Sequence, residues 1–347
     1  MINGSFGRFS VSDRLAALGP PLEPDTIRAA RSAVPPVFRD SPQFVSEHLS
    51  ALAGVPVIVK VESVNPIGSF KGRGTWLAVR HLFETGGVGE DRPLVIASSG
   101  NFGQGCAWAG RAFGVPVVVF ADRHANPRKV ERMRAFGAEV IQDGEDFDAA
   151  RVACAAYAAS RDATLLVDGQ EPWVATGAGG LAVELTDGTA SHDLPALTTA
   201  FVPVGNGALI IGVGAWLRHA APGCRVVGVQ SEGAPSMTLS WRAGHPIETD
   251  TADTWAGGIA SRVPVPEALE EMRGRVDDML LVSNDDLRAA QAELTDALGI
   301  TVEGGGAASW AAIRTAAPGS LEGPVLVLVT GSNAEPRRTN EAGPPEG

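Results

Sequence analysis

Short apolar runs rich in valine recur along this chain, separated by segments long enough for helices. Continuous apolar runs of this length, rather than alternating polar and apolar residues, are typical of strands covered on both faces of a parallel sheet. Strands that alternate with helices predict an α/β fold with mostly parallel sheets. The strands that we expect are Val55–Glu62, Leu94–Ser98, Val115–Ala121, Glu139–Gln142, Leu165–Val167, Ala200–Val204, Arg225–Gln230 and Val325–Val329.

Two of the intervening segments carry clear helix boundaries. Asn126-Pro127 is typical of a cap followed by a proline in the first turn, and Gly137 is the expected stop. Ser283-Asn284-Asp285-Asp286 has the pattern of a capping box, and the helix that it starts is expected to end at Gly299. Both boundaries support the alternation of strand and helix.

The composition argues against several classes of partner. The 347 residues carry a formal net charge of −12 without a cluster of Lys and Arg, which argues against nucleic acid and anionic membrane. No apolar run is long enough for a membrane span, and Met1–Leu15 lacks the layout of a signal peptide. Cys106, Cys154 and Cys224 have no metal or redox spacing and lie in apolar stretches, so we expect buried thiols. Together these features predict a cytoplasmic protein.

Lysine is rare in this chain, and one lysine lies in a glycine-rich segment. The sequence has three lysines, Lys60, Lys71 and Lys129, against twenty-five arginines. Arginine supplies charge, but its guanidinium stays protonated, so an amine that attacks a carbonyl has to be lysine. Lys71 follows Gly68-Ser69-Phe70, where a phosphate or a ring could approach the backbone closely. Taken alone, the segment is equally compatible with a surface lysine in a glycine-rich loop.

Three glycine-rich turns directly follow predicted strands. They are Ser98–Gly105, Gly205–Ala208 and Thr330–Asn333. Ligands of parallel sheets bind beyond the carboxyl ends of the strands, and backbone N–H groups at a helix N-terminus bind phosphate without a cationic side chain. One such turn is an ordinary connection in an α/β fold. Three of them, together with Lys71, predict a site for a phosphorylated ligand.

Taken in order, these four segments resemble the fold-type II enzymes that use pyridoxal phosphate. The similarity runs from about Asp25 to Asn333, and its nearest branch is the serine/threonine dehydratases and serine racemases. It implies two three-layer α/β domains, similar to those of the tryptophan synthase β chain, with pyridoxal 5′-phosphate between them. The segments that carry it are Gly68-Ser69-Phe70-Lys71, Ser98-Ser99-Gly100-Asn101-Phe102-Gly103-Gln104, Val204-Gly205-Asn206-Gly207-Ala208 and Thr330-Gly331-Ser332-Asn333, supported by Gly257–Ala260 and Val302–Ala308.

The resemblance also implies roles for these residues. Lys71 would hold the cofactor as a Schiff base and move the α-proton of the substrate, while Phe70 would pack beneath the cofactor. Asn101 would bind the ring hydroxyl, and Thr330 would face the pyridine nitrogen. The implied cofactor-binding residues are Phe70, Lys71, Asn101, Gly205, Asn206, Gly207, Ala208, Glu303 and Thr330, and the implied substrate-binding residues are Ser98, Ser99, Gly100, Asn101 and Phe102.

Two hydroxyl residues bear on the type of reaction. The neutral hydroxyl of Thr330 would not keep the ring nitrogen protonated, as an aspartate would, and this favours elimination or replacement at the β-carbon over transamination. Ser99 resembles the serine with which racemases of this group deliver a proton opposite the lysine, so it is a candidate catalytic residue beside Lys71. A serine in such a loop is also compatible with capping a backbone group.

The chain departs from the family's pattern at three places. Phe102 stands where dehydratases commonly have histidine, which makes the pocket more apolar. Asn206 interrupts the usual run of glycines, either as a donor to phosphate or as a residue suited to a left-handed turn. Gln230 and Ser236 stand where some relatives bind a divalent cation through carboxylates, so we expect no metal there, although Glu232 would be a ligand in a shifted register.

We therefore expect a pyridoxal-phosphate-dependent lyase that converts a small hydroxy amino acid, such as L-threonine or L-serine, to a 2-oxo acid and ammonia. The resemblance implies a large cofactor-binding domain of residues 1–91 and 169–335 and a small mobile domain of residues 92–168. Residues 336–347 would be a disordered tail, and the usual form of the family is a homodimer. Three alternatives stay open: a β-replacement synthase, a racemase acting on a specialised amino acid, and a pyridoxal-phosphate-binding protein without turnover.

Overall fold

Two sheets organise the structure, a computed structural model that describes residues 15–187, 193–317 and 319–334. Six strands form one sheet in the order β1-β2-β10-β7-β8-β9, in which β1 runs antiparallel and the others run parallel. Four parallel strands form the other sheet in the order β5-β4-β3-β6. The strands are β1 Gln43–Val45, β2 Val57–Val61, β3 Leu94–Ala97, β4 Val117–Ala121, β5 Glu139–Gln142, β6 Thr164–Leu165, β7 Thr199–Pro203, β8 Arg225–Ser231, β9 Asp278–Val282 and β10 Val325–Val329.

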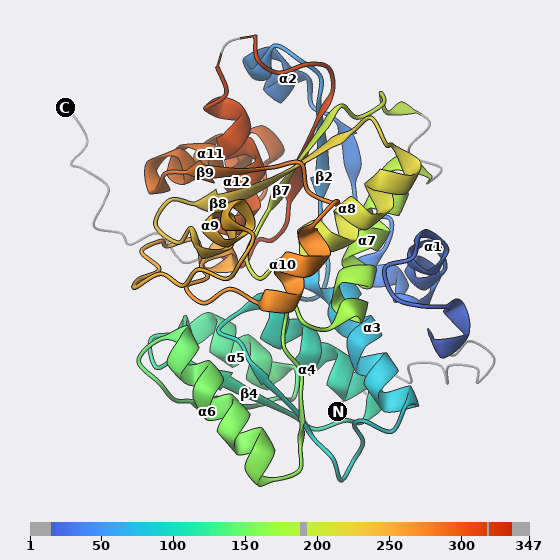
Figure 1. Cartoon of the computed structure of the whole chain (residues 1–347), viewed down its shortest axis with the longest axis vertical. Coiled ribbons are helices and arrows are strands. Elements are labelled where there is room, and N and C mark those ends of the chain that lie inside the picture. The colour runs from blue at the N-terminus through green and yellow to red at the C-terminus, as the bar shows by residue number, and fades with distance from the viewer. Residues whose placement is uncertain (1–14, 188–192, 318, 335–347) are drawn as a thin grey trace.

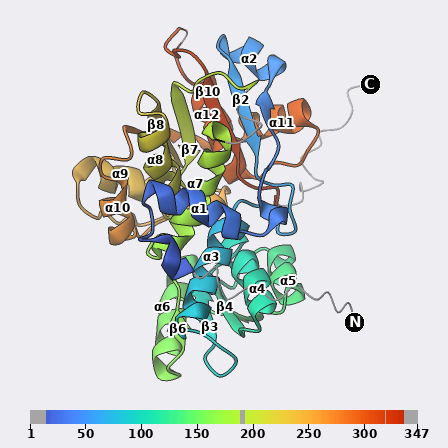
Figure 2. The same ribbon diagram turned by 90° about the vertical axis from the view of Figure 1, so that its right-hand side faces the viewer.

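Helices cover both faces of each sheet (Figures 1 and 2). On the large sheet, α12 and α11 lie on one face and α8 and α7 on the other, while α6 and the pair α4–α5 lie on opposite faces of the small sheet. Helix α3 packs on both α4 and α7 and so joins the two halves. The α-helices are α1 Pro24–Ala33, α2 Glu47–Ala53, α3 Lys71–Glu84, α4 Asn101–Phe113, α5 Pro127–Ala135, α6 Phe147–Ser160, α7 Pro172–Thr186, α8 Ala208–Ala220, α9 Ser236–Ala243, α10 Pro266–Met272, α11 Asn284–Leu298 and α12 Gly304–Arg314.

Strand β10 shows why its continuous apolar run predicts a buried strand. Val325, Val327 and Val329 pack into the core on the side of α11 and α12. Leu326 and Leu328 pack into the core on the side of α7 and α8. Because successive side chains of a strand point to opposite faces, both faces of this sheet need apolar residues. The predicted α/β fold with two three-layer units is confirmed.

Every predicted strand is present, and no end differs from its predicted position by more than two residues. The predicted helix boundaries are also confirmed: Asn126 caps α5 by accepting the Arg128 N–H (2.9 Å), and both bonds of the Ser283–Asp286 capping box form. Strands β1 and β9 were not predicted. Both are edge strands of the large sheet: β1 has only three residues, and β9 consists of Asp278 followed by the short apolar run Met279–Val282.

The structure also bears on the predictions about the cysteines, membrane spans, domains and chain ends. The thiols of Cys106, Cys154 and Cys224 are buried, as predicted. Within the described ranges, no helix combines the length and apolar character that crossing a membrane requires. The strands of the small sheet lie between residues 94 and 165, but the domain boundaries and the mobility of residues 92–168 stay predictions. The tail 336–347 and most of Met1–Leu15 lie outside the described residues.

Candidate active site

Lys71 is the first residue of α3, and hydrogen bonds fix the loop that precedes it. The Asn65 side chain accepts from the N–H of Ser69 (3.3 Å) and donates to the carbonyl oxygen of Ser69 (3.1 Å). The N–H of Phe70 donates to the carbonyl oxygen of Thr330 (3.0 Å). This bond ties the lysine loop to the end of β10. Lys71 therefore extends from a well-anchored point at the carboxyl edge of the large sheet.

The Lys71 side chain makes a close ion pair with Asp168. Its Nζ lies 2.6 Å from Asp168 Oδ2, and the two side chains are 17% and 14% exposed. The same Nζ lies 5.0 Å from the ring centre of Phe70 and 5.6 Å from that of Phe102, within the range of cation–π attraction. The second oxygen of Asp168, Oδ1, is buried and has no hydrogen-bond partner in the described part of the chain.

The turn after β3 folds around a serine hydroxyl. The Ser98 Oγ accepts from the N–H of Gly100 (3.2 Å) and of Gly103 (2.9 Å). The neighbouring Ser99 hydroxyl donates a short hydrogen bond to the carboxylate of Asp122, and its oxygen receives the Asp122 N–H at 3.5 Å. Ser99 thus contacts both an acid and a backbone group, so the geometry is compatible with both interpretations of this residue.

Asn101, the first residue of α4, links three turns of the site. Its Nδ2 donates to Glu303 Oε1 (2.6 Å), and its Oδ1 accepts from Asn333 Nδ2 (2.8 Å). Burial raises the pKa of Glu303, although Lys129 and the Asn101 hydrogen bond favour its charged form. The Asn101 amide is therefore held in one orientation by side chains from the ends of two other segments.

The turn Gly205–Ala208 leads from β7 into α8 and offers free hydrogen-bond donors. Gly207 has a φ of +98°, which glycine adopts without strain. The N–H groups of Gly205, Asn206 and Gly207 donate no hydrogen bond to any residue that the structure describes. A Cβ at position 205 would lie 2.6 Å from the carbonyl oxygen of Gly258, so a side chain would not fit there. Free amides at the start of a helix are a ready site for an anion.

Residues from all of these segments line one cavity of about 270 Å³. Gly257–Ala260, which supported the family resemblance, also lines it. The structure thus brings every site residue expected from the sequence to one place, while the roles of these residues stay predictions. The expected residues that line the cavity are Phe70, Lys71, Ser98, Ser99, Gly100, Asn101, Phe102, Gly205, Asn206, Gly207, Ala208, Glu303 and Thr330.

Three charged residues of the cavity were absent from the sequence prediction: Asp122, Asp168 and Lys129. Asp122 and Asp168 each follow a predicted strand directly, so the rule that located the glycine-rich turns would also have found them. Lys129 lies within α5, and the rarity of lysine is the one sequence feature that would have indicated it. The glycine-rich pattern by itself does not indicate these acids.

No metal cluster is evident among the residues that the structure describes, where no group of three or more His, Cys, Asp or Glu side chains is suitably placed. At the position considered for a cation, Gln230 is buried. Its Oε1 accepts from the N–H and the hydroxyl of Thr238, each at 2.9 Å.

Residues 34–331 match a family model described as "Pyridoxal-phosphate dependent enzyme". The chain belongs to this family. Its cofactor is pyridoxal phosphate. The L-threonine ammonia-lyase of Thermotoga maritima is 31% identical over 312 residues, which cover 90% of this chain and 75% of that protein.

Solved structures agree with the family assignment. The crystal structure of a threonine deaminase from T.th. has a TM-score of 0.80 and 27% sequence identity, over 89% of this chain and 97% of that one. Maize serine racemase has a TM-score of 0.81 and 23% identity, over 90% and 94% of the two chains, and this likeness shows the fold. The resemblance to fold-type II enzymes of the dehydratase and racemase branch is confirmed.

The cavity fits the cofactor of this family. The Lys71 amine can react with an aldehyde, because lysine is a nucleophile once it loses its proton. The free amides of Gly205–Gly207 provide donors for a phosphate, and the close approach of Gly258 explains why position 205 has no side chain. One cavity thus provides an amine for the aldehyde of the cofactor and backbone donors for its phosphate.

Proposed function

We propose that this family member is an ammonia-lyase that eliminates water from a small hydroxy amino acid such as L-threonine or L-serine. The products are a 2-oxo acid and ammonia. The observation that carries the proposal is the cavity in which the Lys71 amine meets a carboxylate and two amide-rich turns. The threonine ammonia-lyase and threonine deaminase relatives support the substrate class.

We assign a separate role to each residue of the cavity. Lys71 takes the α-proton of the substrate, and the N–H groups of the Ser98–Phe102 turn hold the substrate carboxylate. The amides of Gly205–Ala208 would hold the cofactor phosphate, Asn101, which is hydrogen-bonded to Glu303, would bind the ring hydroxyl, and Thr330 would face the ring nitrogen. When bound, pyridoxal phosphate withdraws electrons from the α-carbon, which makes its proton removable.

The aromatic residues exclude water from the reacting amine. Phe70 and Phe102 both lie close to Lys71 Nζ, at 5.0 and 5.6 Å from ring centre to nitrogen. An apolar surrounding strengthens the electrostatic contacts of the site, because less water screens them. Phe102, where relatives commonly have histidine, thus serves packing around the reaction rather than side-chain binding of the carboxylate.

A substrate panel tests the proposal. The purified protein, supplied with pyridoxal phosphate, is expected to release 2-oxo acid and ammonia from L-threonine or L-serine, measured with a coupled dehydrogenase. Product formation that requires an added nucleophile would assign the chain to β-replacement instead. Bound cofactor without turnover of any amino acid would assign it to the binding proteins without turnover.

Racemisation is a second candidate, favoured by the hydrogen bond between Ser99 and Asp122. A serine hydroxyl next to a carboxylate is oriented to exchange a proton with a bound substrate. Chiral chromatography of the amino acid that remains after incubation decides the matter. Enrichment of the D-form supports this candidate, and a substrate that stays fully in the L-form rejects it.

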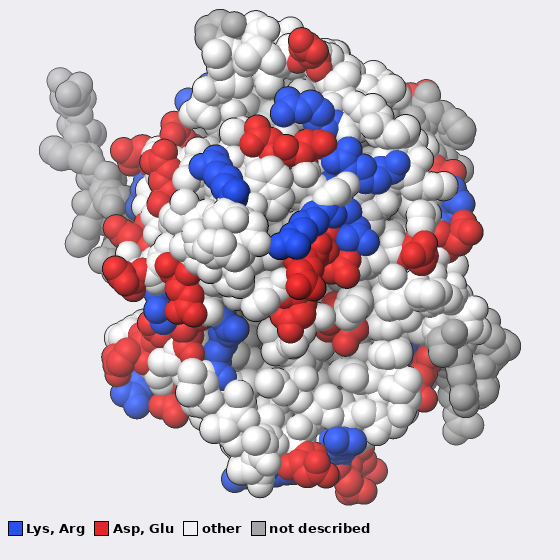
Figure 3. Space-filling model, viewed as in Figure 1, with Lys and Arg blue, Asp and Glu red and all other residues white. Residues whose placement is uncertain are grey.

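We also propose that residues 1–91 and 169–335 form a large domain, that residues 92–168 form a small one that moves on substrate binding, and that the protein is a cytoplasmic homodimer. Charges of both signs are interspersed on the face seen in Figure 3, which supports a small-molecule partner rather than nucleic acid. Analytical ultracentrifugation tests the dimer, since a monomer at micromolar concentration would reject it.

A further inference from the structure

We propose that Asp168 is a second catalytic residue, which binds the β-hydroxyl of the substrate and gives it the proton with which it leaves as water. This role rests on the function proposed above. Asp168 lies outside every segment that carries the family resemblance, so the role comes from the geometry of this cavity.

The contacts of Asp168 leave one oxygen without a donor. Oδ2 lies 2.6 Å from Lys71 Nζ, a short charge-assisted hydrogen bond. Oδ1 is buried and has no partner in the described part of the chain. A buried acceptor without a donor is unfavourable. A substrate hydroxyl that donates to Oδ1 would relieve this cost and would itself be held beside Lys71.

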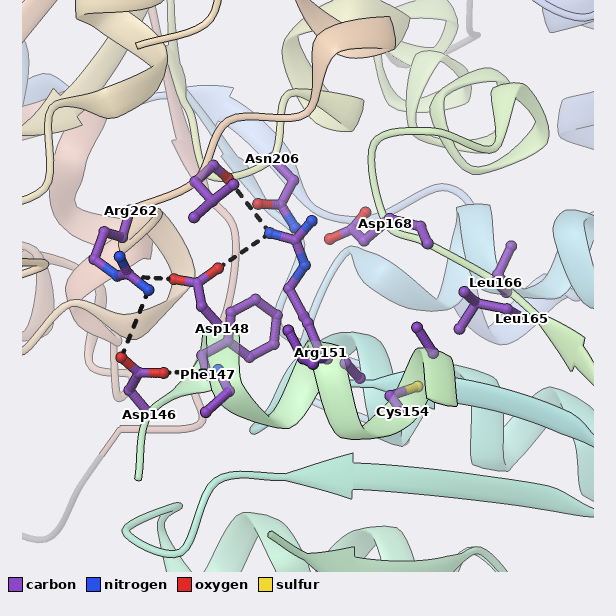
Figure 4. Close-up of a pocket in the computed structure, with 16 residues that line it drawn as sticks. Asp146, Phe147, Asp148, Arg151, Cys154, Leu165, Leu166, Asp168, Asn206 and Arg262 are labelled. Carbon is purple, nitrogen blue, oxygen red and sulfur yellow. Dashed lines mark hydrogen bonds and ion pairs between the residues drawn. The ribbon is translucent and has the colours of Figure 1, made fainter. Parts of the chain in front are cut away.

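Asp168 lies where the site opens into a second space. It lines the cavity that holds the predicted site residues, and it also lines an adjacent cavity of about 600 Å³. Figure 4 shows its carboxylate turned toward the end of that larger cavity where Asn206 and Arg151 lie. The turn Ser99–Phe102, which would hold the substrate carboxylate, lines the smaller cavity and not the larger one. Asp168 is thus placed for the side-chain end of a bound amino acid.

The other acids of the smaller cavity already have partners. Asp122 accepts the hydroxyl hydrogen of Ser99, and Glu303 accepts from Asn101 Nδ2 at 2.6 Å. Neither has a hydrogen bond to Lys71 among the described contacts. Among the acids that line this cavity, Asp168 is the one in direct hydrogen-bond contact with the proposed base.

This contact gives the proton a complete route. The Cα–H bond breaks and the proton moves to Lys71 Nζ, while its electron pair becomes the second bond between Cα and Cβ. Lys71 passes a proton to Asp168 across the 2.6 Å contact. The Cβ–O bond breaks with its electrons on oxygen, and Asp168 gives that oxygen the proton, so that water leaves. The proton lost at Cα ends on the leaving water, and both residues return to their starting states.

A comparison of leaving groups tests this role. Hydroxide needs a proton to leave, whereas chloride does not, so elimination from L-serine requires the acid and elimination from β-chloro-L-alanine does not. In the holoenzyme, Asp168→Asn is expected to lower kcat for L-serine by about 10²-fold or more, and kcat for β-chloro-L-alanine by less than about 5-fold. The control is Asp162→Asn, the same change at a fully exposed acid whose left-handed backbone conformation asparagine also adopts; both rates should stay within about 2-fold.

The outcomes separate the two proposals. Retention of the visible cofactor absorption in Asp168→Asn, with the selective loss on L-serine, supports the role of Asp168. Equal losses on both substrates, or no loss on either, would overturn that role while elimination by the wild type keeps the proposed function intact. A wild-type holoenzyme that eliminates from neither substrate would overturn the proposed function, and the role of Asp168 with it.

Discussion

At the scale of the residue, the three lysines have three distinct surroundings. Lys60 is fully buried with its Nζ 2.8 Å from Glu184 Oε2, Lys71 faces Asp168 in the cavity, and Lys129 lines the same cavity. A chain that uses arginine almost everywhere keeps lysine at an internal ion pair and at the candidate site. The rarity of lysine was therefore an informative signal for Lys71.

Replacing Lys71 with arginine separates charge from nucleophilicity. Lys71→Arg keeps a cation opposite Asp168, but a guanidinium cannot bond to the cofactor aldehyde. We expect a folded protein that lacks the visible absorption band of lysine-bound cofactor and loses about 10³-fold or more in kcat. Absorption spectroscopy and the oxo-acid assay measure the two effects. An unchanged band would mean that the cofactor is held at another amine.

Thr330 offers a test of reaction type. It is buried at the end of β10, and its carbonyl oxygen accepts from the Phe70 N–H, so its side chain starts from a fixed backbone. Thr330→Asp would favour a protonated ring nitrogen, so we expect products of transamination to rise at the expense of oxo acid from elimination. Thr330→Ser keeps the hydroxyl and should keep the wild-type product ratio. Chromatography of the products measures both; identical ratios in all three proteins would refute the assigned role.

At the scale of the element, the sequence predicts strands best where a continuous apolar run marks them. Buried strands such as β10 need apolar residues on both faces, and this requirement is visible in a single sequence. Strand β1, with only three residues, has no such run, because its pairing with β2 depends on the tertiary fold, whereas β9 contains the apolar run Met279–Val282, which was readable in the sequence. The same holds for Asp168: its position after a strand was readable, but its contact with Lys71, ninety-seven residues away, depends on the tertiary fold.

The turn before α8 gives a prediction about cofactor affinity. A Cβ at position 205 would lie 2.6 Å from the carbonyl oxygen of Gly258, so Gly205→Ala must displace backbone on one side of the turn. Because the free amides of this turn are the proposed phosphate donors, we expect the Kd for pyridoxal phosphate to rise by about 10-fold or more. Gly223→Ala, where a Cβ meets nothing within 4 Å, is the control and should leave the Kd unchanged. Equal affinities, measured by fluorescence titration, would count against this turn as the phosphate site.

At the scale of the whole molecule, a buried charge cluster joins β2, α3 and α7. Arg73 donates to Glu62 (2.8 Å) and to Glu184 (2.7 Å), and Lys60 donates to Glu184 (2.8 Å). Burial lowers the pKa of Lys60, and this effect outweighs the attraction of Glu62 and Glu184. Burial alone would raise the pKa of Glu184, but Arg73 and Lys60 together lower it to about 2. Arg73, a member of this cluster, lies two residues after Lys71 on α3, so the cluster also anchors the helix that carries the proposed base.

The pH dependence of stability follows from Glu184. Its folded-state pKa of about 2 lies below its ordinary value of 4.5, so its contribution is complete above about pH 4.5 and is lost as the pH falls toward 2. The shift corresponds to about 3 kcal/mol of unfolding free energy. Glu184→Gln should remove this slope and should also destabilise the protein at pH 7 by about 3–5 kcal/mol, because Arg73 and Lys60 then share a single buried counterion, Glu62.

Denaturant titrations from pH 7 to 2 measure both effects. Glu271→Gln breaks a half-exposed pair with Arg275 and serves as the control, with an expected change below about 1 kcal/mol and an unchanged slope. If the unfolding free energy of Glu184→Gln changes with pH in parallel with that of the wild type, other carboxylates govern acid unfolding. A variant whose stability does not change between pH 4.5 and 2 would show that Glu184, within the buried charge cluster beside α3, sets the acid limit of the fold. The loss of cofactor absorption at low pH should then coincide with unfolding, because Lys71 and Arg73 share the first turn of α3.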